Sequence, residues 1–217
     1  AQTAKRGLAG AIVQSGGPSG AVLATLTFAL VSLMPQDALL AWGWRIPFLA
    51  SAVLVIVAIL VRLGVKESPE FVATERASET ARVPLFATLS QNGVSIVLVV
   101  LTALSPFFLQ SVTSTFGLQY AIGHGNEQAP ALWMLTVSNA LTIFATLFFA
   151  VLSDRFGRVR MMVVGFIVTG VLVWVAFALL SQPNLGAVLV AFIILQPIGN
   201  AMITGPLAAY MADLFPV

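Results

Sequence analysis

Eight residues at 153–160, SDRFGRVR, concentrate four charges between two long apolar runs, in a chain of which only 8% of the residues are charged. Arg155, Arg158 and Arg160 supply three of these charges, and Asp154 supplies the fourth. Lysine and arginine gather in the cytoplasmic loops of membrane proteins, which is enough to explain the arginines. It does not explain Asp154, because an acid at the C-terminal end of a helix opposes the helix dipole by a few tenths to ~1 kcal/mol.

A positive partner is therefore expected to offset the charge of Asp154. Arg155 and Arg158 are close in sequence, and Gly157 permits the tight turn that would return Arg158 to the acid. Arg6, which precedes the first apolar run, is a further candidate from a distant part of the chain. We expect Asp154 to take part in an ion pair that forms when this end of the protein closes and breaks when it opens.

Four amide side chains lie well inside the third, fourth and sixth apolar runs: Gln110, Asn139, Gln196 and Asn200. Gln196 and Asn200 are four residues apart and share one helical face, which Thr204 extends. Amides at membrane depth are costly unless they are paired, so they either bond between helices or line a polar cavity. Each amide alone fits the two roles about equally well, but the four together favour a cavity.

Glycine and proline interrupt two of the apolar runs. The last run contains Pro197, Gly199, Gly205 and Pro206. Such breaks are tolerated where a helix lines a cavity or where a neighbour satisfies the freed backbone groups. In the first run, Gly16 and Gly20 at G-x-x-x-G spacing around Pro18 predict close helix packing with a bend.

Residues for other kinds of chemistry are scarce. The chain has no cysteine, which excludes disulfides and thiolate metal sites. His124 is the single histidine and has no second ligand at metal spacing, so it predicts a solvated loop residue. Every Asp and Glu falls in a loop or at a helix end, so the spans hold no acid for catalysis or for a proton relay. We expect no enzyme, no metal and no cofactor, and a proton-coupling group outside these residues.

The composition indicates that lipid surrounds most of the chain. Hydrophobic residues make up 59% of the 217 residues and the mean hydropathy is +1.01, well above a soluble domain. The net charge is +2 and the pI is near 9.5. The basic residues lie in short loops and not along one surface stripe, which argues against nucleic acid as a partner.

Six apolar runs are long enough to cross roughly 30 Å of hydrocarbon as helices. They are residues 8–34, 46–64, 94–121, 131–152, 161–181 and 186–212. The runs at 46–64 and 161–181 are the most apolar and are expected to face lipid. Barrel strands would give short alternating segments instead. We therefore predict an all-α, polytopic membrane protein with six transmembrane helices.

Basic residues orient these helices. Nine of the ten lysines and arginines fall on one side if each run spans, and only Arg45 falls on the other. The positive-inside rule then places both ends of the chain in the cytoplasm. The polar segment 66–84 lies on that side. Its Ser68-Pro69 pair predicts a short surface helix, and a disordered linker is the alternative.

Four motifs resemble the major facilitator superfamily. SDRFGR is similar to its D-R-x-G-R loop, and WGWRIPF (42–48), KESPEF (66–71) and GPLAAYMADLFP (205–216) resemble its metabolite:proton symporter branch, which is related to the sugar porters. The resemblance covers the whole chain. Valine stands at 159 and 217, where the family usually has a basic residue or threonine, and the basic loop that usually follows LFP is missing.

The resemblance implies that the chain is a fragment of a twelve-helix transporter built from two halves. The six runs would be its fifth to tenth helices. Residues 1–65 would end the N-terminal half, 66–84 would form the cytoplasmic central loop, and 85–217 would begin the C-terminal half. The runs at 94–121 and 186–212 would line the substrate cavity.

The function implied is secondary active transport by alternating access. We expect a monomer in a bacterial inner membrane that moves a small polar metabolite, such as an organic acid, together with protons. Alternatives are a facilitator or antiporter of the same superfamily, or a channel subunit; Val13, where antiporters have glycine, favours symport. The expected cytoplasmic gate comprises Arg6, Asp154, Arg155, Gly157, Arg158 and Asp213.

Overall fold

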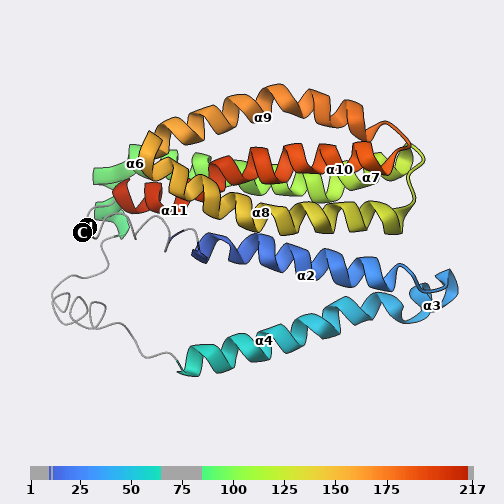
Figure 1. Ribbon diagram of the computed structural model, residues 1–217. Coiled ribbons are helices and arrows are strands. Elements are labelled where there is room, and N and C mark those ends of the chain that lie inside the picture. Colours follow the sequence, from blue (N-terminus) through green and yellow to red (C-terminus); the bar gives the residue numbers. More distant parts are fainter. Residues whose placement is uncertain (1–9, 11, 65–84, 215–217) are drawn as a thin grey trace.

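The computed structural model describes residue 10 and residues 12–64 and 85–214, with the side chains of 85–92 and 95 outside the description (Figure 1). Within these ranges every regular element is a helix, which confirms the all-α prediction. Residues 66–84, predicted to form a cytoplasmic central loop, lie outside the described residues. The division of the chain into parts of two halves therefore stays a prediction.

The helices follow one another along the chain with short connections, apart from α4 and α6, between which residues 65–84 lie outside the description. Their bounds are α2 Gly16–Val31, α3 Gln36–Ala41, the 3₁₀ turn η1 Gly43–Arg45, α4 Ile46–Gly64, α6 Leu85–Ser111, the π-helical segment η2 Val112–Gly117, α7 Leu118–Gly123, α8 Gln128–Phe156, α9 Arg158–Leu180, α10 Leu185–Ile193, the π-helical segment η3 Ile194–Asn200, and α11 Ala201–Leu214.

Five helical stretches of the described chain are long and apolar enough to cross a membrane. They are Gly43–Gly64, Ile96–Gly123, Gln128–Phe156, Arg158–Leu180 and Leu185–Leu214. Each lies within a few residues of a predicted span. The remaining prediction, 8–34, corresponds to α2, whose 16 residues are fewer than a span needs. Residues 1–9 and 11 lie outside the described part, so this span is only partly tested.

Helix α8 lies at the centre of the bundle. Helix α2 packs along one side of it, and α9, α10, η3 and α11 pack along the other (Figure 1). Leu135, Leu180 and Phe192 from three of these helices are fully buried in the core between them. The Ser138 hydroxyl donates to the Phe192 carbonyl at 2.8 Å, so a hydrogen bond between helices reinforces the apolar contact.

Gly205 sets the distance between α11 and α8. A Cβ atom at this position would lie 2.8 Å from the Thr146 carbonyl oxygen and 2.9 Å from the Ala150 nitrogen, both in the backbone of α8. Only a residue without a side chain fits there. The glycine predicted to interrupt the last span is therefore a close-packing position.

The two helices predicted to face lipid differ: α4 is the least enclosed span of the described chain, whereas α9 buries five of its residues. No residue of α4 is buried, and α4 lies against α2 on the side away from α8 (Figure 1). On α9, Trp174 is 79% exposed. Both surfaces are apolar, as lipid-facing surfaces are.

The close packing predicted at Gly16 and Gly20 is wrong. A Cβ atom built at either glycine meets no heavy atom within 4 Å. Helix α2 instead buries Ala29 and Val31, which lie at its other end. The G-x-x-x-G spacing brings two glycines to one face, but no helix backbone of the described residues approaches that face.

Candidate functional site

Three of the four predicted cavity amides, Gln110, Gln196 and Asn200, lie beside a proline and a π-helical segment. Pro106 lies inside α6, ahead of η2, and Pro197 lies inside η3. Proline removes a backbone donor, and π turns shift the carbonyls out of the regular ladder. Directly before Pro106, the Ser105 hydroxyl donates to the Thr102 carbonyl at 2.9 Å, the acceptor that the missing N–H of Pro106 would otherwise bond.

Three of the four predicted amides meet in one group, which we call the amide cluster: Gln110, Gln196 and Asn200. The Asn200 Nδ2 group donates to Gln196 Oε1 at 3.1 Å and to Gln110 Oε1 at 3.3 Å. It also lies 3.3 Å from the Pro106 carbonyl oxygen. Gln196 and Asn200 are buried and Gln110 is half-buried. Asn200 therefore joins η3 to α6 at the depth of the apolar spans.

A cavity of about 310 Å³, the amide cavity, opens beside this cluster. It lies between α6, the end of η3, α11 and the N-terminal part of α2 together with the two residues Val13 and Gln14 before that helix. Its polar lining comprises Gln14, Gln110, Asn200 and Thr204, and its apolar lining includes Pro18 and Phe107. The described lining has hydrogen-bonding groups and no charged side chain, so it suits a small polar molecule.

Asn139 is not part of this group. It is buried on α8 and does not line the amide cavity. Its Nδ2 atom and the Gln196 Nε2 atom have no hydrogen-bond acceptor within the described part of the chain. The Thr169 hydroxyl likewise has no partner there. Unsatisfied buried donors are costly, by roughly 1–3 kcal/mol each, so a bound molecule that accepted their hydrogen bonds would recover this cost.

Gln14 is a cavity residue that the sequence reasoning missed. The stretch around it was interpreted through its glycines alone, as a packing motif. The available signal was the amide itself, since Gln14 is a polar side chain in an apolar run, three residues before Gly17-Pro18. Thr204 was predicted only as an extension of the amide face and does line the cavity.

Asp154 and Arg158 of SDRFGRVR form a second group with Asp213, at the end of the bundle where α8 and α11 end and α9 begins. We call this the Arg158 end. Gly157 joins α8 to α9 with a φ of 93°, in the region that favours glycine. The turn at this glycine places Arg158 at the first position of α9, next to the last turn of α8.

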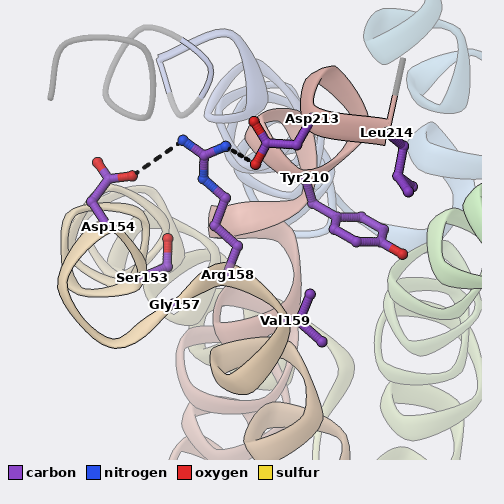
Figure 2. A pocket seen from close by; sticks show the side chains of 8 residues that line it. All are labelled: Ser153, Asp154, Gly157, Arg158, Val159, Tyr210, Asp213 and Leu214. Carbon is purple, nitrogen blue, oxygen red and sulfur yellow. Dashed lines mark hydrogen bonds and ion pairs between the residues drawn. The ribbon is translucent and has the colours of Figure 1, made fainter. Parts of the chain in front are cut away.

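Figure 2 shows Asp154 and Asp213 on opposite sides of the Arg158 guanidinium. Arg158 Nη2 lies 3.6 Å from Asp154 Oδ1. Arg158 Nη1 donates to Asp213 Oδ2, and also to the Ala209 carbonyl at 3.0 Å. One arginine thus connects the C-terminal ends of α8 and α11, and it offsets the acid that opposes the α8 dipole.

A pocket of about 490 Å³ lies around this ion pair, and Tyr210 is among its lining residues (Figure 2). Arg155 is exposed and forms no ion pair within the described residues. Arg6, the predicted partner from the opposite part of the chain, lies outside the described residues. The structure therefore brings together Asp154, Gly157, Arg158 and Asp213, and leaves Arg155 apart.

Metal chemistry finds no support in the part of the chain that the structure describes, since no three His, Cys, Asp or Glu side chains gather there. The amide cluster offers hydrogen bonds inside the spans, and the Arg158 end offers a shared ion pair. Both kinds of interaction can form and break. Such interactions bind and release, and they involve no nucleophile or acid–base pair at membrane depth.

Two family models match the chain. The Major Facilitator Superfamily model matches residues 93–217, and the model described as Sugar (and other) transporter matches residues 1–97. No solved structure gives a significant match.

Several curated proteins are similar along most of the chain. The inner membrane metabolite transport protein YhjE of Escherichia coli is 34% identical over 98% of this chain and 50% of its own length. The shikimate transporter of the same organism is 30% identical over 88% of this chain and 44% of its own length. The citrate-proton symporter of Klebsiella pneumoniae is 24% identical over 94% of this chain and 46% of its own length. The chain spans about half the length of the curated relatives it matches.

The family models, these relatives and the helical bundle agree. The relatives are transport proteins and not enzymes, and the described helices have the length and composition of membrane spans. This chain is an integral membrane protein that belongs to the major facilitator superfamily.

Proposed function

We propose that this chain forms part of a secondary active transporter that moves a small polar metabolite, such as an organic acid, by proton symport. The amide cavity is the observation that carries the proposal. It places hydrogen-bonding groups among apolar helices, where they are costly unless they serve a bound polar molecule or one another. Alternating access would move the part that contains α2 and α4 against the part that contains α6 to α11.

The chemistry of the amide cluster supports a substrate with hydroxyl and carboxyl groups. An amide both donates and accepts hydrogen bonds, so it matches either group. Gln196 Nε2 and Asn139 Nδ2 supply two further donors without acceptors in the described part. We therefore propose Gln110 and Asn200, which line the amide cavity, as substrate-binding residues. We propose Gln196 and Asn139 as well, although their donors are buried and would have to turn toward the cavity when substrate binds.

The names of the relatives support the class of substrate and the coupling ion. One is a shikimate transporter and another is a citrate-proton symporter, and both named compounds are carboxylic acids. No Asp or Glu of the sequence lies within one of the six predicted spans. The group that carries the proton is thus proposed to lie outside these residues.

We propose that the ion pairs at the Arg158 end form a cytoplasmic gate. Asp154, Arg158 and Asp213 are its core, Gly157 shapes the turn, Arg155 stands beside it, and Arg6 is the proposed partner from the other half. The support is geometric, because the shared guanidinium holds the ends of α8 and α11 together. Opening this end would break those contacts.

The proposed location is the bacterial inner membrane, with both ends of the chain in the cytoplasm and the protein as a monomer. The distribution of lysine and arginine supports the orientation, and the name of the similar inner membrane protein supports the location. Lipid, the metabolite and protons are the proposed partners.

Uptake measurements on the full-length transporter test the proposal. Cells or proteoliposomes would be given radiolabelled citrate or shikimate under an imposed proton gradient. We expect saturable, concentrative uptake that a protonophore abolishes. Alanine at Gln110, Asn139, Gln196 or Asn200 should raise the apparent KM about tenfold, which is the loss of roughly one substrate hydrogen bond. Gln119→Ala is the matched control, because Gln119 is exposed on α7 and should leave KM unchanged.

The same assay separates the alternatives. A facilitator would equilibrate the substrate without responding to the gradient, an antiporter would need a counter-substrate or the opposite gradient, and a channel would not saturate. An unchanged apparent KM in all four alanine variants would contradict the assignment of the cavity residues even if uptake were proton-coupled.

A further inference from the structure

An apolar groove of about 350 Å³ lies between α8 and α9 near the Arg158 end. It shares no lining residue with the amide cavity or with the pocket around the ion pair. Its lining includes Phe149, Leu152, Phe156, Arg160, Val164 and Met202. Neither the transport proposal nor the gate uses these residues.

The groove runs along the bundle. Phe149, Leu152 and Phe156 recur on α8 at spacings of three and four residues, so they form one stripe. At 1.5 Å per residue this stripe extends about 10 Å from the last residue of α8 into the apolar part of the bundle. Met202 of α11 lies at the back and is buried, whereas Phe156 and Val164 are exposed. The groove is therefore open to the lipid side and closed behind.

Arg160 is the single charged residue of the groove lining. Its Cδ atom lies 4.0 Å from the position that a Cβ on Gly157 would occupy, so its stem folds back over the turn between α8 and α9. Its guanidinium thus lies at the end of the groove nearest the membrane surface. Arg160 is exposed and has no ion pair within the described residues, whereas Arg158 is already shared by two acids.

We propose that this groove binds an anionic phospholipid. One acyl chain lies along the stripe of α8 against Met202, and the phosphate accepts hydrogen bonds from Arg160. The apolar wall favours any acyl chain of matching length. The arginine selects for negative charge, because guanidinium and phosphate form strong, charge-assisted pairs. This binding goes beyond the proposed function and does not depend on transport.

Lipid binding can be measured directly on the intact protein. The purified protein in a neutral detergent would be titrated with dioleoyl phosphatidylglycerol or with dioleoyl phosphatidylcholine, which share their acyl chains, and bound lipid would be counted by native mass spectrometry. We expect phosphatidylglycerol to bind about fivefold more tightly, the ratio expected for one basic residue at an anionic lipid. Arg160→Gln should abolish that preference.

Two further variants keep the test sharp. Arg155→Gln removes an equally exposed arginine outside the groove, and should leave the preference intact. Val164→Trp fills the open side of the groove and should lower the binding of both lipids. Equal binding of the two lipids by the parent protein would overturn the proposal. So would an equal loss of preference in Arg155→Gln and Arg160→Gln, or unchanged binding in Val164→Trp.

Discussion

Asn200 shares two amide hydrogens among three acceptors: Gln196 Oε1, Gln110 Oε1 and the Pro106 carbonyl. At least one of these oxygens lacks a full hydrogen bond, so the cluster can accept another from a hydroxyl group. The pairing of Gln196 with Asn200 was predictable from their spacing. The contact with Gln110 was not, because it joins residues 90 positions apart and depends on how α6 and η3 pack.

Gly157 carries the most specific backbone requirement among these residues. Its φ of 93° and ψ of 132° suit glycine and strain any other residue. Gly157→Ala should destabilise the protein by about 1–3 kcal/mol, the usual cost of such a conformation. Gly170→Ala is the matched control, because Gly170 lies inside α9 with open space around it and should gain roughly 0.5–1 kcal/mol.

Reversible unfolding in mixed micelles followed by circular dichroism would measure both variants. Equal stability of Gly157→Ala and the parent protein would show that the turn adopts another conformation in the membrane. The turn itself was predictable, since a glycine between two apolar runs beside charged residues favours it. The sign of φ was not.

At the scale of elements, Gly205 fixes how closely α11 lies against α8. Gly205→Ala would place a methyl group within 3 Å of the α8 backbone, and neither backbone can move aside cheaply. We expect a loss of about 1–3 kcal/mol, typical of overpacking. Gly20→Ala, with nothing within 4 Å of its Cβ position, should not destabilise the protein. Unfolding by denaturing detergent would compare the two, and equal stability would contradict the packing.

The spans themselves were predictable because an apolar run of the right length has few alternatives to a membrane helix. Which helix each span packs against was less predictable. The sequence offered two sets of glycines, at 16 and 20 and at 199 and 205, and only the second meets another helix closely. The π-helical segments were also missed, since the prolines predicted a break but not its form. Which glycine is used depends on the neighbouring helix, and that is a tertiary property.

At the scale of the whole molecule, Arg158 ties α8, α9 and α11 together at one end. Asp154→Asn removes one of its two carboxylates and should favour the state that is open at this end. These 217 residues have no cysteine, so a Tyr210→Cys label at the pocket reports access there once any cysteine elsewhere in the full-length protein is replaced. We expect labelling by a water-soluble maleimide to become several-fold faster.

Asp37→Asn is the control for that measurement, because Asp37 is an exposed acid on the short helix α3, far along the chain from the pocket. It should leave the labelling rate unchanged. If Asp154→Asn also leaves it unchanged, the ion pair does not govern opening. The return of Arg158 to Asp154 was predictable from the glycine between them, whereas the pairing of Arg158 with Asp213 depends on how α9 and α11 pack.

The position of α2 has a consequence for how the molecule is assembled. Its main partner, α8, is synthesised roughly 100 residues later, an interval of about 5–20 s at cellular rates of elongation. During that time α2 must reside in lipid without its partner. Its hydroxyl groups need no partner helix during that time. Those of Ser19, Thr25 and Thr27 each donate a hydrogen bond to the carbonyl four residues back along the chain. Helix α2 can thus be self-sufficient until α8 is made.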